Sequence, residues 1–310
     1  MELLREILDP EFLFRNAVDT SVLVGLAAPV VGAFLVLRRM IFLGVALPQI
    51  SSTGIALALS LHVWYGHYDG GHGAEERVLA FIGSIGFALV AVCVLAFLDR
   101  HRRGSPEGRI GTAYVVSIAI SILLLAKCPQ AERGWLDLFK GQIFAIKTSD
   151  LVATAVTMLL VVGALLAFRN PLLLVSFDRD LALVLKRNVL FWDVLLYLLV
   201  GLAISVAVIS VGPLMTFGFM LVPPLIAHLF AANMRQFILI ASAIGGVIAL
   251  AGFCVAYKYD LPGGPTDVAL LGALYALVFT GKKMATMTRR WRMAKDAAET
   301  ADATAVKGPL

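Results

Sequence analysis

Residues 189–211, VLFWDVLLYLLVGLAISVAVISV, decide the fold class. The run holds a single charged side chain, Asp193, and a helix needs roughly 20 mostly apolar residues to cross the hydrocarbon core of a bilayer. A helix also satisfies its own backbone hydrogen bonds, which an irregular chain in lipid does not. The run therefore predicts a transmembrane helix.

Similar apolar runs follow one another along the chain. Hydrophobic residues make up 60% of the sequence and charged residues 15%, whereas about a quarter of a soluble domain is charged. We therefore predict an all-α, polytopic transmembrane bundle of about eight or nine spans. The predicted spans are residues 20–37, 41–64, 78–98, 110–126, 151–168, 189–211, 213–232, 237–257 and 268–280. Gly212 and Pro213 allow either a reversal or a re-entrant bend, so the parity of the count stays open.

The basic residues are concentrated in alternate loops and in the tail. Most of the 26 Lys and Arg residues fall on one side of this alternation, and that side is expected to be cytoplasmic. Residues 1–19 then form an extracytoplasmic segment, residues 20–281 the membrane domain, and residues 282–310 a basic cytoplasmic tail that frays. The net charge of +5 belongs to these segments, and no nucleic-acid partner is expected.

The second span contains a polar stretch, residues 48–54, PQISSTG. Polar side chains are costly in lipid, so Gln49, Ser51 and Ser52 are expected to face a substrate pathway or to hydrogen-bond between helices. Pro223, in the seventh span, is a further pathway candidate because proline frees a backbone carbonyl; a plain helix kink is the alternative.

The loop at residues 66–76, GHYDGGHGAEE, combines imidazoles with carboxylates. His67, Asp69 and His72 are candidate ligands for a divalent cation. Their spacing matches no fixed ligand motif, and a solvated loop is the alternative interpretation.

Residues 169–188, RNPLLLVSFDRDLALVLKRN, predict a short helix at about 176–187. Ser176 or Asp178 can cap its start, and Asp178 and Asp180 suit the positive end of the helix dipole. One apolar stripe follows, made by Phe177, Leu181, Val184 and Leu185. Such a helix lies on the bilayer surface or docks into a groove of a cytoplasmic partner.

The sequence has no nucleotide-binding motif of its own. GxxxxGK[ST], HExxH and GxSxG are all absent from it. We therefore expect a protein that is not an enzyme, whose energy comes from another chain or from an ion gradient.

Four stretches carry a family resemblance, in chain order. They are GAFLVLRRM at 32–40, GRIGTAY at 108–114, LLVSFDRDLA at 173–182, and VGPL with LVPP at 211–214 and 221–224, followed by DLPGGP at 260–265. With these motifs the chain resembles the membrane subunits of ABC importers in the zinc/manganese/iron permease family.

The resemblance implies a type II-like permease that imports a divalent metal such as zinc, manganese or iron across a prokaryotic plasma membrane. It implies a homodimer in the lipid bilayer, with two ABC ATPase subunits that hold ATP and Mg²⁺ and an extracytoplasmic solute-binding protein. This chain itself is expected to bind no cofactor. The predicted helix at 176–187 becomes the coupling helix, and Ser176, Phe177, Asp178, Asp180, Leu181, Val184 and Leu185 become its ATPase contacts.

The sequence departs from the family at the start of the second span. The family has Asp and His there, one helical turn apart, where this chain has Val45 and Gln49. Valine does not ligate a cation, and a Gln carbonyl is a weak neutral ligand. The alternatives are thus the same architecture with a chelated or non-metal solute, and an ATP-independent channel or carrier.

Overall fold

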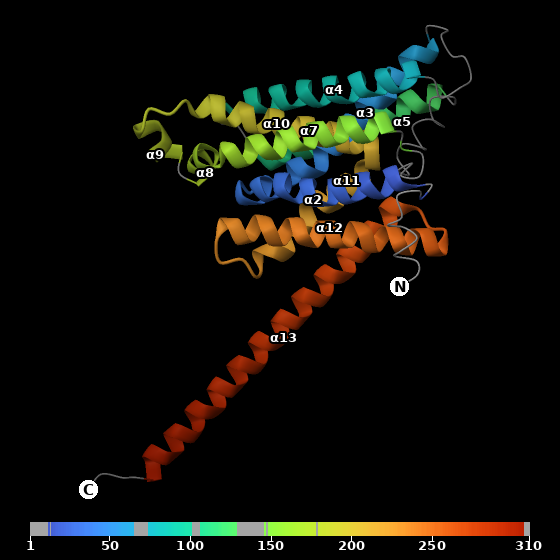
Figure 1. Cartoon of the computed structure of the whole chain (residues 1–310). Coiled ribbons are helices and arrows are strands. Elements are labelled where there is room, and N and C mark those ends of the chain that lie inside the picture. Colours follow the sequence, from blue (N-terminus) through green and yellow to red (C-terminus); the bar gives the residue numbers. More distant parts are fainter. Residues whose placement is uncertain are drawn as a thin grey trace. The chain divides into compact units, whose positions relative to one another are not determined.

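The fold consists of long apolar helices. The computed structural model describes residues 12, 14–64, 74–100, 106–128, 146, 148–177 and 179–306, and the description below concerns these residues. Their helices are α2 (Arg15–Leu37), α3 (Ile41–Trp64), α4 (Ala74–Arg100), α5 (Pro106–Lys127), α7 (Thr148–Ala167), α8 (Arg169–Phe177), α9 (Arg179–Val184), α10 (Val189–Val211), α11 (Pro213–His228), α12 (Met234–Tyr259) and α13 (Gly263–Val306) (Figure 1). The predicted all-α transmembrane bundle is confirmed: eight of these helices are long and apolar enough to cross a membrane.

Contacts at the helix ends show how the helices run. Asn16 at the start of α2 donates to the hydroxyl of Thr148 at the start of α7, at 3.1 Å. Arg38, directly after α2, bonds to Ser176 in α8, which follows α7. Helices α2 and α7 therefore run in the same direction, and α8 and α9 lie at the end of the bundle where α2 stops.

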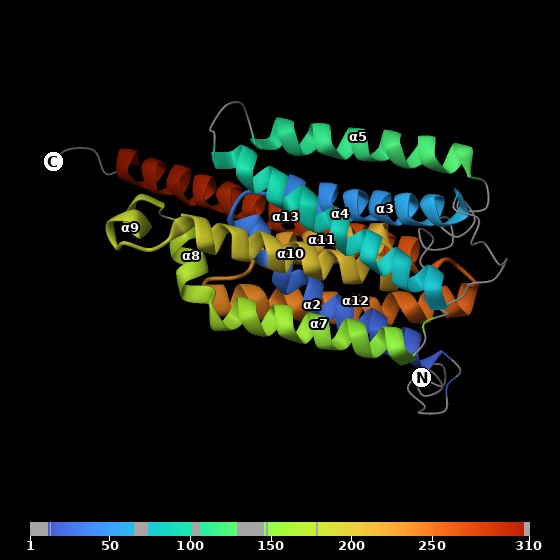
Figure 2. The same cartoon turned by 90° about the horizontal axis from the view of Figure 1, so that it is seen from above.

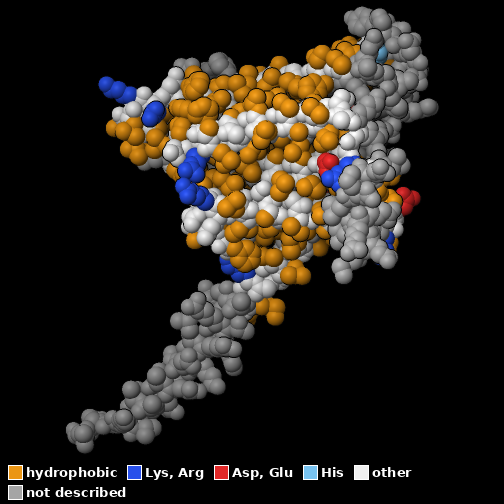
Figure 3. Space-filling model, in the orientation of Figure 1, with side chains coloured by type: hydrophobic (Ala, Val, Ile, Leu, Met, Phe, Trp, Pro, Cys, Tyr) orange, Lys and Arg blue, Asp and Glu red, His pale blue; other side chains and the backbone are white. Residues whose placement is uncertain are grey.

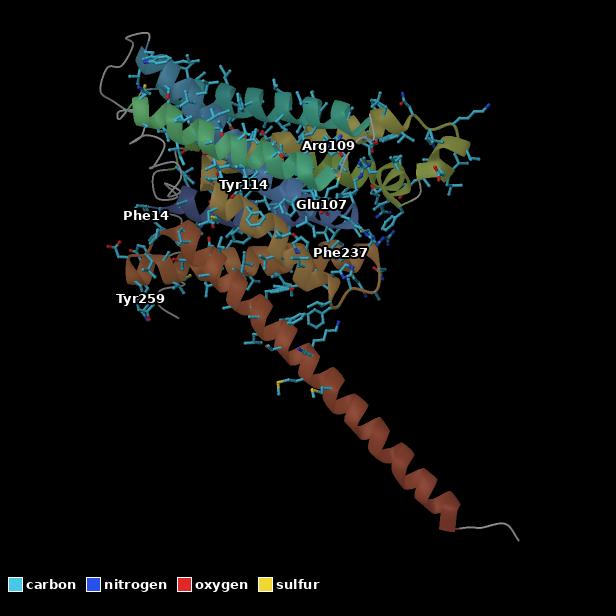
Figure 4. All side chains as sticks on the ribbon, turned by 180° about the vertical axis from the view of Figure 1, so that it is seen from behind. Phe14, Glu107, Arg109, Tyr114, Phe237 and Tyr259 are labelled. Carbon is cyan, nitrogen blue, oxygen red and sulfur yellow. The ribbon has the colours of Figure 1, made fainter. Side chains whose placement is uncertain are left out.

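We call that end the basic end. It carries the cationic residues next to the ends of α2, α5, α8, α10 and α12, and the visible face in Figure 3 shows Lys and Arg side chains there. These residues are Arg38, Arg39, Arg109, Arg169, Lys186, Arg187 and Arg235. In Figure 4, Glu107, Arg109 and Phe237 lie towards one end, and Phe14 and Tyr259 towards the other.

A reversal at Gly212 separates α10 from α11. Gly212 has φ 84° and ψ 161°, and Pro213 occupies the first turn of α11, where its missing N–H costs nothing. Helix α10 starts at the basic end, after α9. Helix α12 also starts there, because the ring of Tyr257 near its other end contacts Phe12, 5.4 Å between centroids, ahead of α2.

Helix α11 must therefore carry the chain back. Its 16 residues span about 24 Å at 1.5 Å per residue, and the turn that follows completes the return. Among the described residues, the helices from α2 to α12 thus follow the predicted run of spans, with the shorter α11 between the long helices α10 and α12.

Helices α2, α3 and α10 form the buried centre. Figure 2 shows α5 and α7 on opposite sides of α2 and α10. Lipid gives helices no hydrophobic push towards each other, so close approach depends on small residues. A Cβ added to Gly245 of α12 would lie 2.0 Å from the Gly25 carbonyl oxygen of α2, and one added to Gly54 of α3 would lie 2.3 Å from the Gly83 oxygen of α4. These two crossings are backbone-to-backbone contacts.

The last helix is much longer than the predicted span at 268–280. Helix α13 continues to Val306, whereas we expected the tail to fray. Alanine, lysine, arginine and methionine make up most of the tail, and all four favour helix. The chain divides into two compact units, Met1–Leu271 and Gly272–Leu310, so α13 contributes to both.

Candidate functional site

The hydroxyls of the polar stretch in α3 bind neighbouring helices. The hydroxyls of Ser51 and Ser84 of α4 are paired, and Ser84 also donates to the carbonyl of Ser205 in α10 at 3.2 Å. Thr53 shares a hydrogen bond with Ser121 of α5 at 2.8 Å. Ser51 thus takes part in hydrogen bonds between helices, which was the alternative to a place on a substrate pathway. Ser52 is also buried.

Gln49 differs from these hydroxyls. Gln49 and Val45 are both partly exposed and stand one helical turn apart, so they share a face of α3. Pro48 is buried behind them. Across the described residues, no group of three or more His, Cys, Asp or Glu side chains is placed to hold a metal ion. The accessible part of the polar stretch is therefore a neutral amide next to an apolar side chain.

Pro223 lies buried in α11, next to Pro224. The two prolines follow Met220 at the third and fourth positions and therefore offer its carbonyl neither of the usual helical N–H donors. Instead the backbone of Gly32 in α2 closes on this carbonyl: a Cβ added to Gly32 would lie 1.6 Å from the Met220 oxygen. Pro223 thus belongs to a tight crossing of α2 and α11.

The segment predicted as one short helix is two. Helix α8 ends at Phe177 and α9 covers Arg179–Val184. Ser176 is not a cap, because it lies in the last turn of α8 and its hydroxyl donates to the Leu172 carbonyl. Asp180 stands in the first turn of α9 and is exposed, while Asp178 lies outside the described residues.

The apolar side chains of this segment are exposed. Phe177 is 68% exposed and Val184 78%, and Leu181 and Leu185 are also exposed. On the other side of the segment, Val175, Ala182 and Val189 form a small buried cluster with Leu174 and Trp192. The segment is therefore held to the start of α10 by one face and presents an apolar stripe on another.

A buried ion pair lies beneath this segment. The Arg38 guanidinium contacts Asp193 of α10 at 2.7 Å, and the two side chains are only 7% and 13% exposed. Nε of Arg38 donates to the Ser176 hydroxyl, also at 2.7 Å. The sequence showed Asp193 as the single charged side chain of its span but did not reveal its partner. The signal for a partner was the charge itself, because a charged residue inside an apolar run rarely stands alone in lipid.

The predicted external cation ligands are not part of this arrangement. His67, Asp69 and His72 lie outside the described residues.

Comparison with known proteins decides the family. The sequence matches the ABC 3 transport family over residues 10–282. The chain belongs to the ABC 3 transport family. It is thus a multi-pass membrane protein and a permease subunit of an ABC transporter.

Individual relatives of this ABC 3 family chain carry metal names. This chain is 28% identical to the manganese import system permease protein ScaB of Streptococcus gordonii. The match covers 89% of this chain and 93% of ScaB. The chain is 27% identical, over 91% and 93%, to the zinc transport system membrane protein TroC of Treponema pallidum. Neither a non-metal cargo nor an ATP-independent carrier is favoured by such relatives.

The fold has a solved counterpart. PsaBC from Streptococcus pneumoniae in complex with Fab contains a chain with a TM-score of 0.73 and 24% identity, matched over 90% of this chain and 94% of that one. The described helices therefore share the fold of that PsaBC chain.

Proposed function

We propose that this chain imports a divalent metal ion, manganese or zinc, as the membrane-spanning half of an ATP-driven importer. The names of the relatives support the cargo, since both ScaB and TroC are named for one of these metals. The metal is the substrate, and the chain holds no resident cofactor.

The ATPase docks on the apolar stripe of α8 and α9. Large apolar side chains exposed outside a membrane are unfavourable unless a partner covers them. The stripe lies at the basic end, in the chain's cytoplasmic loops by the charge rule, and the sequence lacks its own nucleotide-binding motif. This stripe is the observation that carries the proposal. ATP and Mg²⁺ are bound on the ATPase.

The remaining assembly follows from the same orientation. The basic end is cytoplasmic, which places the C-terminal tail inside and the start of α2 outside. A second copy of the chain completes the pathway in a prokaryotic plasma membrane, and a solute-binding protein delivers the ion outside. His67, Asp69 and His72, between α3 and α4, then belong to the outer side, where they collect cations near the entrance.

The ion passes a neutral face of α3. Gln49 offers a carbonyl oxygen, a weak ligand, and Val45 offers none. Weak ligands suit transit, because an ion that is bound too tightly does not leave. Affinity is then supplied by the solute-binding protein, and direction by the ATPase.

The test uses the permease co-expressed with the ABC ATPase and the solute-binding protein that the proposal assigns to it. Cells that lack other manganese importers receive radioactive Mn²⁺ or Zn²⁺, and the permease is purified to see whether the ATPase comes with it. Wild type should accumulate metal above empty vector. Val184→Glu should abolish accumulation and reduce co-purified ATPase at least tenfold, because a charge in an apolar groove is unpaired.

Leu183→Gln is the matched control. Leu183 is 58% exposed on the same helix but lies off the stripe, so this variant should retain both uptake and the ATPase. Metal accumulation by wild type without any ATPase, or ATPase binding that Val184→Glu leaves intact, would overturn the proposal.

A further inference from the structure

Three separate elements meet at Arg38. The residue follows the last turn of α2, and its guanidinium reaches Asp193 of α10 through Nη1 and Ser176 of α8 through Nε, each at 2.7 Å. Ser176 stands one residue before Phe177, the first member of the exposed stripe. A single buried side chain thus joins the stripe-bearing segment to two helices of the buried centre.

The position suits a cation and an anion. The C-terminal end of α2 is the negative end of its dipole, and Asp193 lies near the positive end of α10. Nη2 of Arg38 is nevertheless buried and has no hydrogen-bond partner among the described residues. A buried N–H without an acceptor is unfavourable, so the cluster can gain from a rearrangement that supplies one.

Two sets of close helix crossings lie on the two sides of Arg38. Helix α2 contacts α12 at Gly25 and Gly245, and α11 at Gly32, through backbone atoms. Helices α3, α4, α5 and α10 are linked by the hydroxyls of Ser84 and Ser121. The turn at Arg38 and Arg39 leads from the first group directly into α3, and the bond to Asp193 reaches the second.

We propose that Arg38 is a positioning residue that transmits movement of the α8–α9 segment to the boundary between these two helix groups. A displacement of α8 pulls on the guanidinium through Ser176. The pull changes the contact with Asp193 and reorients the turn that leads into α3. Val45 and Gln49, on the accessible face of α3, follow its first residue, Ile41, by four and eight positions. This inference rests on the proposed function, because it needs an ATPase to move the segment.

The test measures coupling and folding separately. Permease variants are reconstituted with the ATPase in proteoliposomes, and the ratio of metal ions transported to ATP hydrolysed is recorded beside the thermal midpoint of each complex. Arg38→Gln removes the cation, Ser176→Ala removes only the link to α8, and Arg38→Gln/Asp193→Asn removes both charges together. Arg15→Gln is the matched control, since it breaks an Arg–Asp pair on the same helix that is partly exposed.

The double variant distinguishes a role of Arg38 in transmitting movement from a role in stabilising the fold. Arg38→Gln alone leaves Asp193 without its cation and should lower the midpoint, whereas the double variant should recover it because no buried charge lacks its counterpart. The transport ratio should stay at least tenfold below wild type in the double variant, fall at least threefold in Ser176→Ala, and remain unchanged in Arg15→Gln.

The two ways to fail are distinct. If the ratio recovers together with the midpoint in the double variant, or Ser176→Ala transports normally, Arg38 only supports the fold and the inference is wrong. If wild type binds no ATPase or transports no metal when ATP is supplied, the proposed function fails, and the inference fails with it.

Discussion

Replacing Gly32 by alanine should damage the bundle more than most single methyl groups do. The added Cβ would lie 1.6 Å from the Met220 carbonyl oxygen, 2.6 Å from its carbon and 3.1 Å from its Cα. Real Cβ atoms do not approach within 3.0 Å, so α2 and α11 would have to separate by at least about 1.4 Å. Backbone atoms do not rotate away, and a gap of about 1 Å already forfeits up to half of each van der Waals contact along the crossing.

We therefore expect Gly32→Ala to cost about 2–4 kcal/mol, at or above the usual cost of overpacking. The measurement is the thermal midpoint in detergent, followed by the fraction of permease that stays monodisperse after heating. Detergent unfolding is commonly irreversible, so midpoints are compared at one scan rate. At a few degrees per kcal/mol for a protein of this size, the midpoint should fall by about 5–10 °C.

Gly86→Ala is the control for this experiment. Gly86 also lies within a span, but a Cβ added there would meet nothing within 4 Å. Alanine is the better helix former by up to about 1 kcal/mol, so this variant should melt at or slightly above the wild-type temperature. Equal midpoints for Gly32→Ala and Gly86→Ala would refute the argument that backbone contact holds α2 against α11.

Two other substitutions address buried polar groups. Asp267 is 1% exposed, and its Oδ1 has no hydrogen-bond partner within the described part of the chain. Asp267→Asn should therefore leave stability unchanged or raise it by up to about 2 kcal/mol, so the thermal midpoint should not fall; a clear fall would contradict this argument. Ser84→Ala removes bonds to α3 and α10 and should cost about 0.5–1.5 kcal/mol while transport per folded complex, measured as metal uptake, stays at the wild-type rate. Reduced uptake at full stability would instead make the Ser51–Ser84 pair part of the pathway.

Hydropathy predicted the helices well wherever the apolar run coincides with the helix. The bounds of α3 and α10 agree with the predicted spans at both ends. Helix α2 begins at Arg15, five residues before the predicted start, because a turn of polar residues stabilised by an i, i+4 ion pair carries no apolar signal. The same limit explains the length of α13, whose second half is polar and helical.

Side-chain partners were harder to predict than helices. The sequence showed the polar stretch in α3. It did not show that Ser51 faces α4 while Gln49 remains accessible, because the direction of each side chain depends on how α3 is rotated against its neighbours. The assignment of Phe177 to α8 and Leu181 to α9 was hidden for a similar reason, because these two residues have helical spacing whether they belong to one helix or to two. The Arg38–Asp193 pair joins residues far apart in sequence, and no periodicity links them.

The distribution of contacts restricts how this permease can move. Two crossings bring backbones into direct contact, Gly25 against Gly245 and Gly54 against Gly83. At such a crossing, sliding would push a carbonyl oxygen into the neighbouring backbone. Helices α2 and α12 should therefore move as one body, and so should α3 and α4. Relative movement must then occur where helices touch through longer side chains, because these side chains can change rotamer. The accessible face of α3 begins just beyond the turn that joins the two bodies, and the side chain at that turn is Arg38. A transport cycle that left the Arg38 contacts unchanged would have to open the pathway by bending a helix, and α2, α3 and α11 each contain proline, which favours a bend.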